Sequence, residues 1–240
     1  LWFNFYEDLN DFLPEAQRSV IFSSQFIGTP SIKDAIEAIG VPHTEIDLIL
    51  VNGKPVTFEQ RVYGGELVCV YPQVELFVNR PEVHLRPKPL REIKFIVDVN
   101  LGKLALKLRL LGFDTLYKNN FTDREIVALS LREQRIILTR DKGVLKYKAA
   151  KHGYWIRNDD PNRQLKEVVN RLQLHPHFHL FTRCSVCNTQ LQPIDKELVK
   201  ERLADDTLQF VDDFMLCPGC KKIYWRGSHY ERFRKYINKL

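Results

Sequence analysis

The stretch Ile93-Lys94-Phe95-Ile96-Val97-Asp98 joins a short apolar run to a terminal carboxylate. Successive β-branched and aromatic residues are typical of a strand covered on both faces, so the run predicts a buried strand of a parallel sheet. Asn100 then stands where it can cap a helix, whose apolar positions from Leu101 to Leu111 recur every three or four residues until Gly112. The segment therefore predicts a strand, a turn and a helix, with Asp98 at the turn.

The same arrangement recurs further along the chain. Residues 122–125, Thr-Asp-Arg-Glu, form a capping box that places Asp123 in the first turn of a helix. Residues 135–139 are a second apolar strand, and Asp141 follows it. Sites in open parallel sheets form outside the carboxyl ends of the strands. We therefore expect Asp98 and Asp141 to converge there, with Asp123 joining them.

Three converging carboxylates would suit a divalent metal ion. Hard carboxylate oxygens favour Mg²⁺ or Mn²⁺, and an ion of this kind activates water and offsets the charge that builds on a phosphodiester. Lys103, Arg140 and Lys142 are close in sequence to the acids, where they can hold flanking phosphates. The alternative for any single Asp is a helix cap or turn. This alternative is equally suited to Asp159 and Asp160, which are secondary candidates before Pro161.

Charge is unevenly distributed along the 240 residues. Residues 1–80 hold 5 basic and 11 acidic side chains, for a charge of −6; residues 81–180 hold 20 and 11, for +9; and residues 181–240 hold 11 and 8, for +3. A basic middle region predicts a polyanionic partner such as RNA, although a run such as Lys103, Lys107 and Arg109 can also be a solvated helix face. The chain has no run of 18 apolar residues, so we expect a soluble, cytoplasmic protein with no membrane partner.

The N-terminal region predicts a separate α+β domain. Its expected elements are strands at 2–6 and 20–26, a capped helix at 31–39, and strands at 46–51 and 66–71. The Asn52-Gly53 pair predicts a hairpin turn. This order resembles the β-grasp fold of ubiquitin and of small sulfur carriers. Because Gly64-Gly65 is internal and predicts a turn, carrier chemistry through a free Gly-Gly tail is not expected.

Five cysteines separate into a pair of knuckles and a lone residue. Cys184-x-x-Cys187 and Cys217-x-x-Cys220 predict a tetrahedral four-cysteine zinc site, closed and therefore structural. Disulfides are the alternative, which a reducing compartment disfavours. A helical insertion is expected at 195–210, between the knuckles. Cys69, in a predicted strand, is interpreted as a core residue.

The segment Tyr224-Trp225-Arg226-Gly227-Ser228-His229-Tyr230 follows the second knuckle. Its mixture of aromatic faces with Arg226 and His229 is typical of side chains that stack on bases or contact phosphate, and we expect these two residues to bind RNA. The alternative is that the aromatic residues complete the small core of the zinc ribbon.

Several of these motifs together resemble the Mut-seven C-terminal RNase domain family. They are Asp98 to Ala105, Leu110 to Thr115, Leu138 to Asp141, the two knuckles and Tyr224 to Tyr230. The resemblance implies a PIN-like α/β nuclease domain with a fused zinc ribbon, and an N-terminal ubiquitin-like domain related to sulfur carriers. It also implies that Asp98, Asp123 and Asp141 bind Mg²⁺ or Mn²⁺ and cut RNA. Some PIN-like relatives carry Glu directly after the first Asp, where this chain has Val99.

The predicted organisation has four parts. A ubiquitin-like β-grasp domain occupies residues 1–80, a proline-containing linker 81–91, a PIN-like α/β domain with a parallel sheet 92–177, and a four-cysteine zinc ribbon 178–240. The predicted function is a Mg²⁺- or Mn²⁺-dependent ribonuclease with a structural zinc. The rival hypotheses are a non-catalytic RNA-binding module, and an adaptor that recruits a protein partner through its ubiquitin-like domain.

Overall fold

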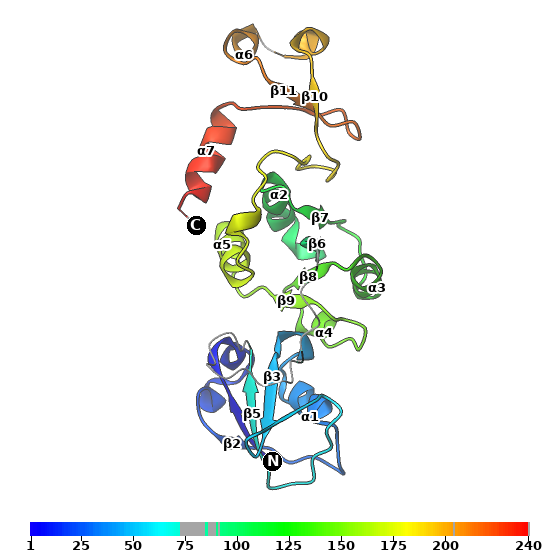
Figure 1. Ribbon diagram of the computed structural model, residues 1–240, viewed down its shortest axis with the longest axis vertical. Coiled ribbons are helices and arrows are strands. Elements are labelled where there is room, and N and C mark those ends of the chain that lie inside the picture. The colour runs from blue at the N-terminus through cyan, green and yellow to red at the C-terminus, as the bar shows by residue number, and fades with distance from the viewer. Residues whose placement is uncertain (73–84, 86–89, 91, 204, 240) are drawn as a thin grey trace. The chain divides into compact units, whose positions relative to one another are not determined.

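The computed structural model describes residues 1–72, 85, 90, 92–203 and 205–239 (Figure 1). Contacts divide the chain into two compact units, Leu1–Glu92 with Thr122–Trp155, and Ile93–Phe121 with Ile156–Leu240. The predicted linker at 81–91 falls almost entirely outside the described residues, and the predicted domain boundaries remain predictions. No described helix has the length and apolar character needed to cross a membrane.

The N-terminal part of the first unit is a five-stranded sheet. Its strands are β1 (Trp2–Phe5), β2 (Phe22–Ser23), β3 (Leu48–Val51), β4 (Lys54–Val56) and β5 (Leu67–Tyr71), in the order β2-β1-β5-β3-β4. Strands β1 and β5 are parallel and the other pairs antiparallel. The predicted β-grasp arrangement is confirmed, with β4 as an additional strand. The hairpin from β3 to β4 turns at Asn52 and Gly53, whose φ angles are 48° and 79°.

Helix α1 (Ile32–Ile39) begins and ends as its sequence predicts. The Ser31 hydroxyl accepts a hydrogen bond from Asp34 N at 3.1 Å, and Gly40, with φ 125°, ends the helix. The core of this domain includes Phe3, Phe5, Ile36, Val68 and Val70. The interpretation of Cys69 as a core residue is wrong, because its side chain is only half-buried. Side chains alternate between the two faces of a strand, so the valines on either side of Cys69 face the core instead.

The first unit also holds a strand and helix pattern from residues 122–155. It contains α3 (Asp123–Glu133), β8 (Ile136–Thr139), α4 (Lys142–Leu145) and β9 (Gly153–Trp155). The predicted capping box is confirmed, because the Thr122 side chain accepts from Glu125 N while the Glu125 carboxylate accepts from Thr122 N. Strands β8 and β9 pair in parallel, with Ile137 opposite Gly153.

The second unit opens on another parallel pair, β6 (Lys94–Val97) and β7 (Asp114–Leu116), in which Phe95 lies opposite Thr115. A 3-10 turn, η4 (Val99–Leu101), leads into α2 (Gly102–Leu110), and α5 (Pro161–Arg171) packs near α2. The expected cap at Asn100 is wrong, because Asp98 caps the turn itself. Strand β7 was not predicted. Parallel pairs with intervening helices confirm the α/β class of the central region.

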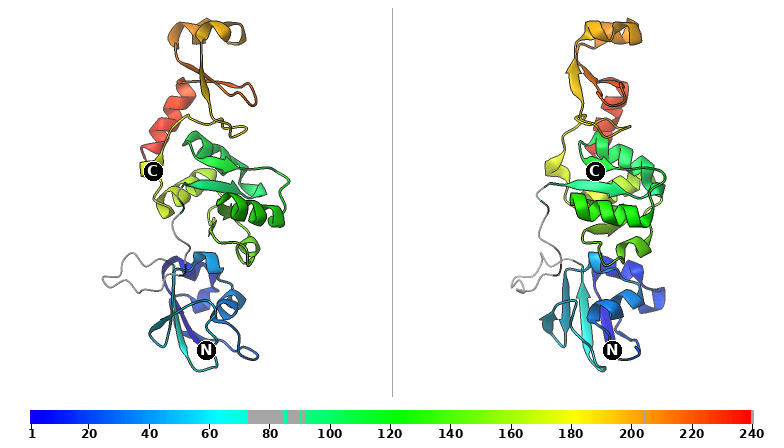
Figure 2. Two further views of the ribbon diagram at one scale, coloured as in Figure 1. Left: turned by 45° about the vertical axis from the view of Figure 1, so that its right-hand side comes forward. Right: turned by 90° about the vertical axis from the view of Figure 1, so that its right-hand side faces the viewer.

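The C-terminal part of the second unit is an antiparallel ribbon. Its strands are β10 (Gln192–Ile194), β11 (Phe214–Leu216) and β12 (Ile223–Trp225), with β11 in the middle. The predicted helical insertion is present as two 3-10 turns, η6 (Lys196–Leu198) and η7 (Lys200–Arg202), and helix α6 (Asp205–Phe210). Helix α7 (Ser228–Ile237) follows β12, and the ribbon strands and α7 can be followed in Figure 2.

Candidate functional site

The four predicted zinc ligands come together. The Sγ atoms of Cys184, Cys187, Cys217 and Cys220 all lie within 4.8 Å of one another, with pairs at 3.5 Å (Cys184 to Cys220) and 3.2 Å (Cys187 to Cys217). Four thiolates around a tetrahedral zinc with Zn–S bonds of about 2.3 Å lie about 3.8 Å apart. All four thiols are free of disulfides. The group therefore has the donor set and the spacing that zinc requires.

Hydrogen bonds favour the charged forms of the Cys184 and Cys187 thiols. Burial and the hydrogen bonds shared with the other three thiols raise the pKa of Cys220 instead. In each knuckle the backbone N–H of the second cysteine donates to the Sγ of the first, at 3.4 Å. The Tyr224 hydroxyl lies 3.1 Å from the Sγ of Cys184. Burial acts to raise the pKa of Cys187, but hydrogen bonds from Thr189 and Cys217 outweigh burial and lower the pKa to about 6. A lowered thiol pKa is the condition under which cysteine binds a metal ion readily.

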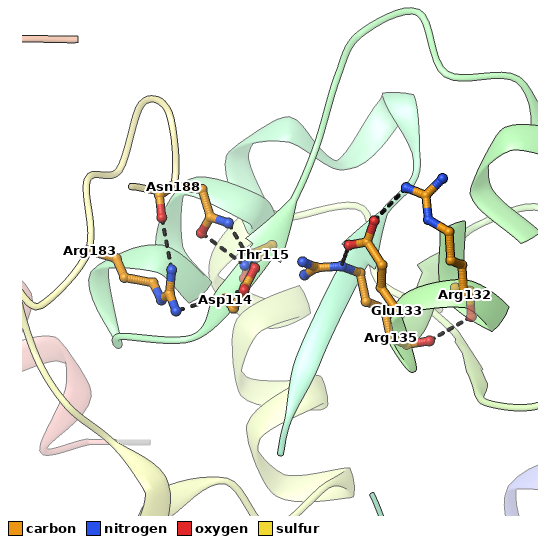
Figure 3. A network of polar contacts seen from close by, with 8 residues as sticks. Asp114, Thr115, Arg132, Glu133, Arg135, Arg183 and Asn188 are labelled. Carbon is orange, nitrogen blue, oxygen red and sulfur yellow. Dashed lines mark hydrogen bonds and ion pairs between the residues drawn. The ribbon is translucent and has the colours of Figure 1, made fainter. Parts of the chain in front are cut away.

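The first knuckle is tied to strand β7 of its unit. The Asn188 side chain accepts from Thr115 N at 3.0 Å and donates to the Asp114 carboxylate at 2.8 Å (Figure 3). The Arg183 guanidinium donates to Asn188 O at 3.0 Å and lies 3.8 Å from Asp114. Strand β7 and the knuckle thus share one polar network.

Arg109 makes a second connection to the same knuckle. It is only 5% exposed and donates to the carbonyl oxygens of Thr115, Ser185 and Val186. Its burial lowers its pKa from the ordinary arginine value. The interpretation of Arg109 as part of a solvated helix face is therefore wrong. Lys107 is half-buried as well, with its amino group 2.8 Å from the Asn162 side chain.

Asp98 lies at the end of β6, as predicted, and is 6% exposed. Its Oδ1 accepts from Val99 N at 2.6 Å, which makes it the cap of η4. Tyr117 supports this turn, because its hydroxyl donates to Val99 O at 3.0 Å. The Tyr117 ring fits against Gly102, where an added Cβ would lie 2.7 Å from the phenolic oxygen. The sequence analysis does not predict this role of Tyr117. The one local sign of it is the glycine at the start of α2, which leaves room for the ring.

Asp141 and Asp123 lie at helix starts in the other unit. Asp141 follows β8, is exposed, and caps α4 by accepting from Gly143 N at 2.7 Å, while its own N–H donates to the Thr139 hydroxyl at 2.9 Å. Asp123 is exposed in the first turn of α3. The secondary candidate Asp160 caps α5 through two backbone N–H groups, as its alternative interpretation predicted.

The acidic cluster stays a prediction. Within the described parts of the chain, the four cysteines are the only group of three or more metal-ligating side chains with ligand atoms within 4.8 Å of one another. Asp98 belongs to one compact unit, and Asp123 and Asp141 belong to the other.

The predicted phosphate-binding cations differ in setting. Lys103 and Arg140 are exposed. Lys142 is half-buried, and its Nζ lies 4.2 Å from the Trp155 ring centroid and 4.8 Å from that of Phe12. Cation–π contacts of this kind hold the ammonium group in place. Lys142 therefore has a packing role beside its predicted contact with RNA. Arg226 and His229 of the ribbon are exposed.

The same aromatic pair links the N-terminal domain to residues 142–155 inside the first unit. The rings of Phe12 and Trp155 lie 4.7 Å apart, and Trp155 N donates to the Glu45 carboxylate at 2.7 Å. The Lys146 amino group donates to Glu37 O at 2.7 Å. His43 Nε2 lies 2.8 Å from Ala150 O. Residues 142–155, which directly follow Asp141, are thus held by contacts from the N-terminal domain.

Comparison with known protein families gives two matches, which together cover most of the chain. A family model described as Mut7-C RNAse domain matches residues 93–237, and one described as Mut7-C ubiquitin matches residues 1–78. Searches of curated proteins and of solved structures gave no match to the chain.

Proposed function

Since the chain belongs to the Mut7-C RNase family, we propose that it is a metal-dependent ribonuclease that hydrolyses RNA phosphodiester bonds. The observation that carries the proposal is the match of the RNase family model to residues 93–237, which include Asp98, Asp123 and Asp141. The charge of +9 over residues 81–180 supports a polyanionic substrate.

We assign Mg²⁺ or Mn²⁺ to the three aspartates. Their donor set fits these ions, because carboxylate oxygens are the ligands that both prefer. The backbone N–H of Val99 orients the Asp98 carboxylate, and Gly143 N does the same for Asp141. Contacts of this kind fix a ligand's direction before an ion binds. When bound, the ion lowers the pKa of the attacking water and offsets charge on the phosphate.

Basic side chains would then position the RNA. Lys103 and Arg140, with Lys142, are the proposed contacts for phosphates flanking the cleaved bond, and Arg226 and His229 of the ribbon extend that contact. We assign zinc to the four cysteines as a structural ion. Four thiolates fill a tetrahedral shell and leave no position for water, so the ion stabilises the ribbon without reacting.

The test is cleavage of a labelled single-stranded RNA with and without added Mg²⁺ or Mn²⁺. Asp98→Asn should reduce cleavage to the metal-free level. Asparagine caps helices as well as aspartate does, so the unfolding free energy should hold or rise as repulsion among the acids is relieved. Asp141→Asn should have the same effect. Asp123→Asn should have a milder effect, because Asp123 is in the first turn of a helix and does not directly follow a strand. Asp212→Asn, at a carboxylate 91% exposed between α6 and β11, is the matched control.

Two outcomes would redirect the assignment. Parent-like cleavage by Asp98→Asn and Asp141→Asn would place the catalytic site elsewhere. Metal-independent RNA binding without any cleavage would favour the rival function, a non-catalytic RNA-binding module.

A protein partner for the ubiquitin-like domain is a second proposal. Trp2 and Leu67 are opposite one another in the β1–β5 register, and they are 49% and 37% exposed. We assign this exposed apolar pair to contact with the partner. A Trp2→Asp, Leu67→Asp variant should lose the partner, measured by titration of the purified partner, while its RNA cleavage matches the parent's. Equal affinity of variant and parent would reject this surface.

A further inference from the structure

The C-terminal ribbon borders a pocket that includes His229, one of the predicted RNA-binding residues, and reaches Leu110 of α2. Its volume is about 530 Å³, and it lies between β12, the start of α7 and the chain before the first knuckle. Sites for small ligands typically measure about 300–1,000 Å³. Five of its twelve lining residues are aromatic: Phe181, Tyr224, Trp225, Tyr230 and Phe233.

The aromatic walls are accessible. Phe181, Trp225, Tyr230 and Phe233 are only half-buried, so their rings do not simply form a closed core. Phe181 and Tyr230 meet edge to face, with centroids 4.6 Å apart and an interplanar angle of 76°. Trp225 lies close over Gly227, where an added Cβ would be 2.7 Å from the indole nitrogen. The alternative prediction, that these aromatics only complete the ribbon core, holds for Tyr224, which is buried against Cys184. It holds in part for Phe181 and Trp225, which pack against the two small core clusters but keep part of their surface exposed.

Positive charge surrounds the pocket. Lys222 and His229 line it and are exposed, and the Arg226 guanidinium lies 5.9 Å from the Tyr230 ring centroid. Residues 214–239 contain seven Lys or Arg and a single acid, Glu231. The first turn of α7 borders the pocket, and among the described side chains none caps that helix. Uncapped N–H groups at a helix start attract phosphate.

We propose that this pocket binds one unstacked base of a single-stranded RNA, with the adjoining phosphates held by Lys222, Arg226 and the start of α7. Aromatic walls receive the face of any base, and the surrounding cations match the backbone charge. The inference rests on RNA being the substrate of the proposed ribonuclease. The inference narrows the substrate to single-stranded RNA. The bases of a duplex are paired and stacked, so they cannot enter the pocket as an unpaired base can.

Binding can be measured without cleavage. Anisotropy of a labelled 12-nucleotide RNA, without added Mg²⁺ or Mn²⁺ and without chelator, leaves the zinc in place. Phe233→Ala and Trp225→Ala should each weaken single-strand binding by about 10- to 100-fold, the effect of losing one stacked base. Phe233→Tyr should restore parent affinity. Phe210→Ala, which removes a ring that is 84% exposed outside the pocket, is the matched control and should bind normally.

A crosslinking readout locates the base directly. Irradiation of RNA that carries 5-iodouridine should attach the base to Trp225, Tyr230 or Phe233, as read by mass spectrometry of peptides. Zinc content and near-ultraviolet circular dichroism check that each variant keeps its fold. Because Phe233 is on α7 and Trp225 is on β12, misfolding of one variant leaves the other as a test.

Three results would overturn the inference. They are parent-like binding by both folded Ala variants, equal affinity for duplex and single strand, and tighter binding of an acidic peptide that the same substitutions abolish. Loss of cleavage in Asp98→Asn with parent-like binding by Phe233→Ala would refute only the pocket. Pocket-dependent binding by a protein that cleaves no RNA would refute only the ribonuclease.

Discussion

Arg109 Nη1 donates a hydrogen bond to the carbonyl oxygen of Val186 at 2.7 Å, which joins helix α2 to the first cysteine knuckle. The knuckle itself supplies the acceptor, since Val186 stands between Cys184 and Cys187. Stability of the zinc site is thereby coupled to the helix that follows Asp98.

Arg109→Lys should loosen the knuckle although it keeps the charge. The single ammonium group of lysine cannot replace the planar guanidinium that donates to three carbonyl oxygens at once. Buried acceptors would lose their partners, so the unfolding free energy should fall by about 2–4 kcal/mol. Zinc transfer to a chromogenic chelator should be faster. Lys103→Ala, at an exposed position of the same helix, should change neither quantity. An unchanged rate of zinc transfer in Arg109→Lys would refute the coupling.

The protein should be isolated with about one zinc per chain. Replacement of Cys217 and Cys220 by Ser removes two ligands, so metal analysis should find little zinc and the melting temperature should drop. Cys69→Ser is the control, because the Cys69 side chain is half-buried in β5 and outside the cluster. Full zinc content in the double variant would disprove the assignment.

Lys142→Ala should destabilise the protein as well as weaken RNA binding. Loss of the contacts with the Trp155 and Phe12 rings should lower the unfolding free energy by about 0.5–2 kcal/mol. Arg140→Ala should weaken RNA binding and reduce its salt dependence with little change in stability. Denaturant unfolding and RNA titrations at several salt concentrations measure the two effects separately. Equal stability of Lys142→Ala and parent would mean that the ring contacts contribute nothing measurable.

Glu133 should make stability depend on pH in the acid range. Hydrogen bonds from Arg132 and Arg135, both 2.7 Å long and drawn in Figure 3, lower its pKa below the ordinary value of 4.5. A carboxyl whose pKa is lower in the folded than in the unfolded chain stabilises the fold at pH values above its unfolded pKa. This contribution is lost as the pH falls through the pKa of the folded state.

The difference in unfolding free energy between the parent and Glu133→Gln should therefore be largest at neutral pH and shrink below about pH 4.5. Denaturant titrations from pH 3 to pH 7 measure it. Because the side chain is 31% exposed, solvent screening keeps the difference to about 1 kcal/mol or less. A difference that grows toward acid pH would contradict the assignment.

Local features of this protein could be predicted because their causes lie within a few residues. The capping box at residues 122–125, the Asn52-Gly53 turn and the Cys-x-x-Cys knuckles each depend on neighbours in the chain. Strand β7 was missed because three residues, Asp114–Leu116, are too short to show a period.

The sequence was enough to predict the four clustered cysteines, the β-grasp order of the N-terminal domain, and the acids that follow β6 and precede α4. Three contacts emerge only in the folded chain: Arg109 is buried against Val186, Tyr117 supports the turn after Asp98, and Lys142 lies against Phe12 and Trp155. The physical reason is sequence separation. A charged residue on a helix has the same local pattern whether water or a carbonyl 77 positions away receives its hydrogen bonds, and only the packed chain distinguishes the two.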